Sequence, residues 1–250
     1  MSAAGEVRAT SFGQIADDYD RVRPGPTDEA LDWLVPAGCR VAIDLAAGTG
    51  LFTRALARRV EQVIAVEPDE RMRSVLAARS PGVRAVAGRG EDIPLPDASV
   101  DGVFISSAWH WLDPDLAVPE IARVLRDGGR LGVIWSGRDR RVDWVDELER
   151  HASARERRQS ERRRRHEVTL PDGAPLEHLA TATFEFTRTM TVDDAADWLT
   201  TYSGFLIAPA EEQAARLAHA REVLAGRADG DGTVRIPMRA SCWRADRLSR

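Results

Sequence analysis

Acidic side chains follow two short apolar runs of this chain, and glycines follow the first of them. The run Val41–Leu45 contains Asp44 and leads into Gly48 and Gly50, and a second apolar run ends at Glu67, 17 residues further on. At the ends of two parallel strands, glycines let a ligand approach the backbone, and a carboxylate on the next strand accepts hydrogen bonds from two ribose hydroxyls. The spacing therefore predicts a site for an adenosine-containing ligand.

The same residues favour one adenosine cofactor over another. A dinucleotide site has a third glycine for close packing of the helix, but Gly50 is followed by Leu51-Phe52-Thr53. Asp44 would repel a pyrophosphate, whereas it would receive the ammonium group of an amino-acid moiety, directly or through water. This favours S-adenosylmethionine over NAD. An NAD-type oxidoreductase and a non-catalytic cofactor-binding protein remain the alternatives.

The elements that must position these residues alternate between strand and helix. The patterns predict strands at 40–45, 62–67, 83–87, 100–106 and 130–135, and helices at 28–35, 51–60, 69–79 and 115–126, with a stop at Asp127-Gly128-Gly129. Such alternation is typical of a doubly wound parallel sheet. Beyond Trp135 the patterns predict a charged helical segment over 138–180, a strand at 182–190, helices at 192–202 and 209–225, and a last strand at 233–244.

Composition limits the classes of protein that remain. The 250 residues suit one domain, with a net charge of −5 that disfavours a nucleic-acid partner. No apolar run reaches 18 residues and no secretory signal begins the chain, so we expect a cytoplasmic protein without a membrane partner. Cys39 and Cys242 are wrongly spaced for zinc, and we expect no metal site. All 35 basic residues are arginine, which excludes lysine chemistry.

Several motifs in succession resemble the class I S-adenosylmethionine-dependent methyltransferases, specifically the small-molecule "methyltransferase type 11" branch. They are Asp44–Gly50, Val66-Glu67, Gly90–Asp101, Leu125–Leu131, the segment from Phe12 through Tyr19 to Arg23-Pro24, Ala108–Asp113, and the terminal Cys242-Trp243-Arg244. The resemblance implies a single domain over 1–250 with a Rossmann-like seven-stranded sheet, mostly parallel with an antiparallel last strand. It also implies an N-terminal segment and helix over 1–35 and helical substrate-cover insertions over 138–180 and 190–230.

The resemblance also assigns roles to individual residues. The implied cofactor-binding residues are Asp44, Ala46, Gly48, Gly50, Glu67, Pro68, Glu91, Asp92, Ser106, Tyr19 and Arg23, with Glu91 and Asp92 near the adenine. Two positions depart from the family pattern. Ala46 replaces the first glycine of the motif, which costs little if its φ is negative, and Arg89 stands where many relatives have an acid. Which side chain recognises adenine is therefore open.

His110 is the candidate catalytic residue, because it follows the fourth strand at the expected ligand edge of the sheet. A neutral imidazole there could take a proton from the acceptor as the methyl group arrives, or it could merely shape the pocket between its neighbours. Substrate contacts are expected at Trp109, Trp111 and Trp144. The arginine-rich run 155–165 favours a solvated helix face or lid over an anion site.

The expected reaction is an in-line displacement of a methyl group from the sulfonium onto a small-molecule acceptor. Oxygen is the first expectation for the accepting atom, nitrogen the second and carbon the third. Methylation of nucleic-acid bases is disfavoured, because Ser106–Trp109 replaces the Asn/Asp-Pro-Pro-aromatic motif of amino-directed enzymes. The patterns leave open whether the protein is a monomer or a homodimer.

Overall fold

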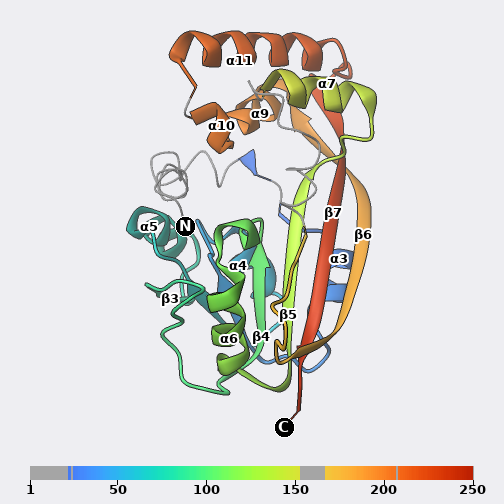
Figure 1. The fold of residues 1–250 in the computed structure, drawn as a ribbon. Helices are drawn as coiled ribbons and strands as arrows, with labels where there is room; N and C mark the ends of the chain where they lie inside the picture. Colours follow the sequence, from blue (N-terminus) through green and yellow to red (C-terminus); the bar gives the residue numbers. More distant parts are fainter. Residues whose placement is uncertain (1–21, 24, 153–166, 207, 250) are drawn as a thin grey trace.

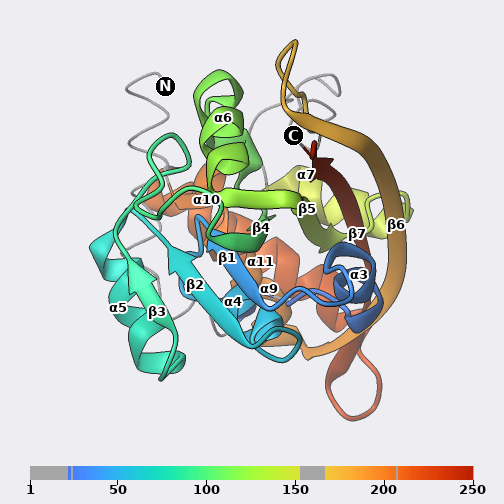
Figure 2. The ribbon, with the colours of Figure 1, turned by 90° about the horizontal axis from the view of Figure 1, so that it is seen from below.

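The computed structural model describes residues 22–23, 25–152, 167–206 and 208–249. The described part of the chain forms a seven-stranded sheet in the order β3-β2-β1-β4-β5-β7-β6. The strands are β1 (Val41–Leu45), β2 (Gln62–Val66), β3 (Arg84–Val86), β4 (Val100–Ser106), β5 (Leu125–Arg138), β6 (Leu176–Thr191) and β7 (Thr233–Arg247). Figure 2 shows this order from the end of the strands. The predicted Rossmann-like, mostly parallel sheet with an antiparallel last strand is confirmed.

The described helices alternate with the first strands and then gather in a separate layer. They are α3 (Asp28–Leu34), α4 (Leu51–Leu56), α5 (Glu70–Arg79), η2 (Trp109–Trp111), α6 (Pro114–Val124), α7 (Asp143–Ala152), α9 (Val192–Asp197), η3 (Trp198–Thr201), α10 (Ser203–Leu206) and α11 (Ala210–Ala225). Side chains at the N-caps start several of them: Thr27 accepts from Ala30 N–H, and Asp69 accepts from Arg71 N–H.

The parallel strands bring the candidate acids to one edge of the sheet. β1 pairs with β2 and with β4, and Asp44 lies opposite Ala65 on one side and Phe104 on the other. Glu67 follows β2 directly, so Asp44 and Glu67 lie at neighbouring carboxyl ends. These strands are almost wholly apolar and buried, because α3 and α4 cover one face of the sheet and α6 covers the other.

Three strands continue beyond this edge and carry the remaining helices. β4 ends at Ser106 opposite Ile134, whereas β5 continues to Arg138 along β7. β7 lies between β5 and β6 and runs antiparallel to both. Helices α7, α9, α10 and α11 lie above the carboxyl edge, at the far ends of these strands (Figure 1). We call this group with η3 the cover; its core includes Leu148, Trp198, Leu199 and Leu224.

Several boundaries differ from the sequence prediction, and two of them differ because strand pairing overrides local pattern. Of the segment 138–180, helix is described only at Asp143–Ala152; residues 153–166, with the whole arginine-rich run 155–165, lie outside the described residues. β6 already begins at Leu176, which pairs with Arg247 six residues before the predicted start. Helix α6 ends at Val124, because Leu125 pairs with Val100 to begin β5.

Candidate functional site

The loop between β1 and α4 contains two glycines that serve different purposes. Gly50 has φ +83°, and a Cβ placed there would lie 2.7 Å from Leu76 Cγ, so this glycine allows α5 to pack against the loop. Gly48 has φ +57°, and a Cβ there would meet no atom within 4 Å. Gly48 therefore borders open space at the edge of the sheet, while Gly50 is required by packing.

Ala46, which replaces the first glycine of the motif, has a positive φ. Its φ is +58°, in the left-handed region that favours glycine. An alanine in that region costs about 1–2 kcal/mol. The condition under which this replacement would cost little, a negative φ at Ala46, is therefore not met. The loop keeps the backbone path of a glycine-rich motif, and the contacts of the surrounding fold compensate for the strain at Ala46.

Asp44 is buried with one carboxylate oxygen unused. The side chain is 1% exposed, and its Oδ2 accepts a hydrogen bond of 2.6 Å from the Thr53 hydroxyl on α4. Its Oδ1 is buried and has no hydrogen-bond partner. Burial and, to a smaller extent, the nearby Glu67 carboxylate raise the pKa of Asp44 to about 7, although the hydrogen bond from Thr53 acts in the opposite direction. A buried carboxylate oxygen without a partner is costly, and a cationic donor would satisfy it.

Glu67 ties the loop after β1 to the loop after β2. Its Oε2 accepts from Gly48 N–H and its Oε1 accepts from Asp69 N–H, both at 2.9 Å. The side chain is 7% exposed; burial raises its pKa, while the two N–H bonds act in the opposite direction. Arg73 holds the same turn by donating to the carbonyls of Glu67 and the exposed Pro68. Each carboxylate oxygen of Glu67 has a second lone pair with which to accept from a ligand.

The loop after β3 is fastened to the segment that follows β4. Glu91 Oε1 accepts from Asp113 N–H at 3.0 Å, whereas the Asp92 residue is exposed. The backbones of Arg89 and Asp92 bond to each other in both directions at 3.2 Å. Glu91 is thus directed toward the residues after η2, although the family resemblance places it near adenine.

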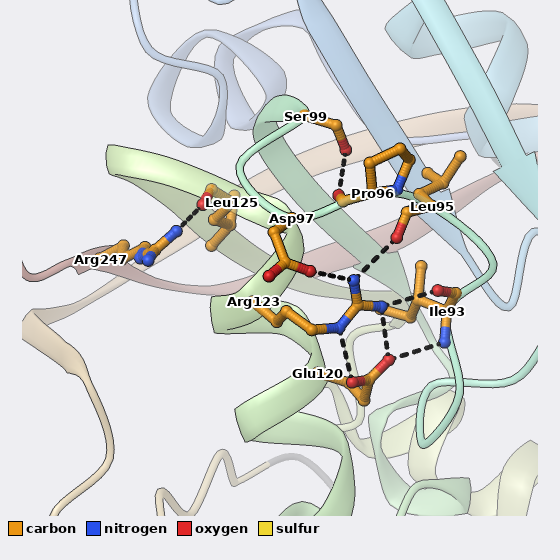
Figure 3. Close-up of polar contacts among 9 residues, drawn as sticks. All are labelled: Ile93, Leu95, Pro96, Asp97, Ser99, Glu120, Arg123, Leu125 and Arg247. Atoms are coloured by element: carbon orange, nitrogen blue, oxygen red, sulfur yellow. Dashed lines mark hydrogen bonds and ion pairs between the residues drawn. The ribbon is translucent and has the colours of Figure 1, made fainter.

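An arginine of α6 holds the continuation of this loop (Figure 3). Arg123 donates to the carbonyls of Ile93 and Leu95 at 2.9 and 2.8 Å, and it pairs with Asp97 and Glu120 at 2.8 Å each. These carboxylates raise the pKa of Arg123. Arg123 therefore ties the loop to α6.

The segment after β4 carries His110 in a short 3-10 turn. Ser106 ends the strand, and Ser107 has φ +57° with its N–H bonded to Ile134 O at 2.8 Å. Trp109 is 4% exposed and packs in the core against the sheet. His110 is partly buried, and its ring centroid lies 4.6 Å from that of the partly buried Trp111. Trp109 thus anchors the turn that holds His110 and Trp111.

Two other predicted site residues contact the cover. Arg23 donates to the Thr201 hydroxyl at 2.9 Å and to the Thr201 carbonyl at 3.2 Å, and its guanidinium lies 4.9 Å from the centre of the Tyr202 ring. Trp144 packs against the core of the cover, with the Arg227 guanidinium 4.8 Å from its ring. Trp144 therefore belongs to a different cluster from Trp109 and Trp111. Tyr19 lies outside the described residues.

A buried ion pair joins the end of β5 to the cover. The side chain of Arg138 is fully buried, pairs with Glu149 at 3.0 Å and also donates to Ala195 O. The Tyr202 hydroxyl donates to the same Glu149 at 3.2 Å, and the Trp198 ring lies 4.2 Å from the Arg138 guanidinium. Burial raises the pKa of Tyr202, so this hydroxyl stays protonated. Breaking such a pair by removing one partner costs about 3–5 kcal/mol.

Known proteins that resemble this chain in sequence are methyltransferases. Residues 43–133 match the sequence model of a methyltransferase domain. The chain is 40% identical over 225 residues to an uncharacterized methyltransferase of Mycobacterium tuberculosis, covering 90% of each. It is 30% identical over 215 residues to an uncharacterized methyltransferase-like protein of Schizosaccharomyces pombe, covering 84% of each. The chain belongs to the class I S-adenosylmethionine-dependent methyltransferases.

A solved structure resembles this methyltransferase over most of its length. The structure of a putative type II methyltransferase from Anaeromyxobacter dehalogenans has a TM-score of 0.70 and 28% identity, and the match covers 91% of this chain and 99% of that one. Within the described residues, no helix is long and apolar enough to cross a membrane. No group of three or more His, Cys, Asp or Glu side chains in the same residues is placed to hold a metal ion.

The methyltransferase brings together only some of its predicted site residues. The loops after β1 and β2 unite Asp44, Gly48 and Glu67, whereas Gly50 faces α5 and Arg23 binds the cover. Thr53 was missed, although it lies one helical turn after Gly50 and its hydroxyl can reach back to the strand. Tyr202 was also missed, because nothing in the local sequence indicates that it contacts Arg23.

Proposed function

We propose that this methyltransferase binds S-adenosylmethionine at the carboxyl edge of β1 and β2 and transfers the methyl group to an oxygen or nitrogen of a small molecule. The unpartnered, buried Oδ1 of Asp44 carries this proposal. An ammonium group would satisfy that oxygen, and Gly48 leaves room beside it for the methionine end of the cofactor. A dinucleotide offers no cation at this position.

The neighbouring loops complete the proposed cofactor site. Glu67 would accept from the ribose hydroxyls with the lone pairs that Gly48 and Asp69 leave unused. We infer that the adenine lies beside the loops after β2 and β3, near the exposed Pro68 and Asp92. We infer that Ser106, which ends β4 beside β1, contacts the cofactor, and that Arg23 meets its carboxylate. When bound, the cofactor supplies a methyl group on a sulfonium that is already an activated leaving group.

The protein would then mainly orient the acceptor and manage one proton. We assign to His110 the role of base, because it stands in the turn after β4 at the same edge of the sheet. A neutral imidazole takes the proton from a hydroxyl or amine as the new bond forms, which is typically worth about 100-fold or more in rate. Trp111 lies against this ring and would line the acceptor site with an apolar face.

Equilibrium titration tests the cofactor assignment. Isothermal calorimetry with S-adenosylmethionine, S-adenosylhomocysteine and NAD should show saturable binding of the first two only. Binding of NAD without any response to S-adenosylhomocysteine would refute the proposal and favour the oxidoreductase alternative. Incubation with methyl-labelled cofactor and a metabolite extract, followed by mass spectrometry of the labelled product, then identifies the acceptor. Cofactor binding without transfer to any fraction would favour a non-catalytic binding protein.

A further inference from the structure

The loop after β3 touches the segment after β4 at two adjacent points. Glu91 Oε1 accepts a hydrogen bond from Asp113 N–H at 3.0 Å. A Cβ on Gly90 would lie 2.8 Å from Leu112 Cδ2, so the backbone of the loop rests directly on the Leu112 side chain. The first contact is a hydrogen bond and the second is close packing. Together they hold the segment after β4 against the loop after β3.

The contacted residues end the turn that holds His110. Leu112 N–H donates to Trp109 O, and Trp111 N–H donates to Ala108 O, which closes the 3-10 turn just before Asp113. Asp113 is in turn the N-cap of α6, its side chain accepting from Asp115 N–H. A displacement of Asp113 would therefore be transmitted to both the His110 turn and the start of α6.

The Glu91 carboxylate also suits this position electrostatically. Asp113 N–H lies at the N-terminus of α6, where backbone N–H groups lack partners within the helix and negative charge is stabilising. Charge-assisted hydrogen bonds of this kind are roughly twice as strong as neutral ones. Further along the same loop, Arg123 and Glu120 of α6 hold Ile93, so the loop is fastened at both ends of its contact with the helix.

We propose that Glu91 is a positioning residue that holds the His110 turn through Asp113 N–H, and that it does not recognise the adenine. The assignment rests on the proposed function only in giving His110 a part in methyl transfer. The placement of the turn by Glu91 is a property of the protein without any ligand.

The test compares three variants of the full chain. Glu91→Ala removes the acceptor, Glu91→Gln keeps an amide oxygen in the same place, and Asp97→Ala removes a carboxylate from the same loop without touching the segment 107–113. The measurements are amide hydrogen exchange of a peptide spanning that segment, the NMR shift of the His110 ring proton, and the Kd for S-adenosylhomocysteine. The NMR signal is assigned by its loss in His110→Asn. It is sensitive to position because the Trp111 ring lies 4.6 Å away.

We expect Glu91→Ala to speed exchange in 107–113 by about 10-fold, as loss of one charge-assisted hydrogen bond implies, and to shift the His110 signal. Glu91→Gln should restore both, and Asp97→Ala should change neither. The Kd should stay within about twofold, since the lost bond lies within the protein.

Unchanged hydrogen exchange and an unchanged His110 signal in Glu91→Ala overturn the proposal, whatever happens to the Kd. A Kd raised by about 10-fold or more with an unchanged segment would make Glu91 an adenine ligand. If the wild type binds no S-adenosylhomocysteine, the proposed function fails, while the exchange and NMR results still decide the role of Glu91.

Discussion

If Asp44 binds the cofactor as proposed, its buried carboxyl should make cofactor binding depend on pH. In the protein without ligand its pKa is raised to about 7, because the side chain is buried and Glu67 lies nearby. A cationic group at Oδ1 would favour the ionised form and lower this pKa, so we expect binding to release a proton. Affinity should therefore fall as the pH drops through 7 and level off about one pH unit above it.

The size of the effect follows from the shift. If the bound ligand returns the pKa of Asp44 to about 4, its ordinary value, the affinity for S-adenosylhomocysteine should fall roughly 15-fold between pH 7.0 and pH 5.5. About half a proton should leave per ligand bound at pH 7 by the same linkage. The range is kept below pH 7.5 so that the amino group of the ligand stays charged.

Calorimetry in two buffers of different ionisation enthalpy measures both quantities. Asp44→Asn keeps an acceptor for the Thr53 hydroxyl but cannot ionise, so it should bind about 10- to 100-fold more weakly at pH 7 and lose the pH dependence. Glu67→Gln is the control: it should weaken binding and, because the Glu67 carboxylate contributes to the raised pKa of Asp44, move the pH dependence to lower pH without abolishing it. A wild-type affinity that is flat from pH 5.5 to 7.0, or a slope that survives in Asp44→Asn, would refute this account.

Three further predictions concern the same edge of the sheet. Gly50→Ala should lower the free energy of unfolding by about 2–4 kcal/mol in urea titration, because the costs of the positive φ and of the overlap with Leu76 add. Gly48→Ala should lower it by only about 1 kcal/mol yet weaken cofactor binding. Equal losses of stability in the two variants would contradict the different roles given to Gly48 and Gly50. Glu67→Ala should weaken S-adenosylhomocysteine binding by about 1.5–3 kcal/mol in calorimetry, the value of charge-assisted bonds, and an unchanged Kd would remove Glu67 from the site. His110→Ala should cut turnover by about 100-fold with unchanged cofactor affinity; retained turnover would make His110 a wall of the pocket.

Much of the parallel half of the fold was predictable from local pattern. Apolar runs bounded by glycine and acid mark buried strands, and β4 was placed at Val100–Ser106, the same bounds that the structure has. The order of Asp44, Gly48 and Glu67 along the chain then implies their meeting, because neighbouring parallel strands end at one edge. That part of the candidate site needs no information beyond the topology.

Long-range contacts were not predictable in the same way. The start of β6 depends on pairing with β7 about 70 residues later, and the positive φ of Ala46 depends on a loop path that the strands and α4 impose. Glu91 was assigned by family position, yet its partner is a backbone N–H in another loop. The partner of a charged side chain is set by which groups lie near it in the folded structure. The spacing of residues in the sequence therefore does not reveal that partner.

The place of β7 has a consequence for how the chain is made. β7 lies between β5 and β6, although its residues Thr233–Arg247 are synthesised after both. During translation β6 has no strand to pair with until β7 leaves the ribosome, and the helices of the cover are held at the far ends of these strands. The edge of β5 is exposed over the same interval, and unpaired strand edges are sites of aggregation. The cover should therefore be the last part of the molecule to fold, and its assembly should await the final strand.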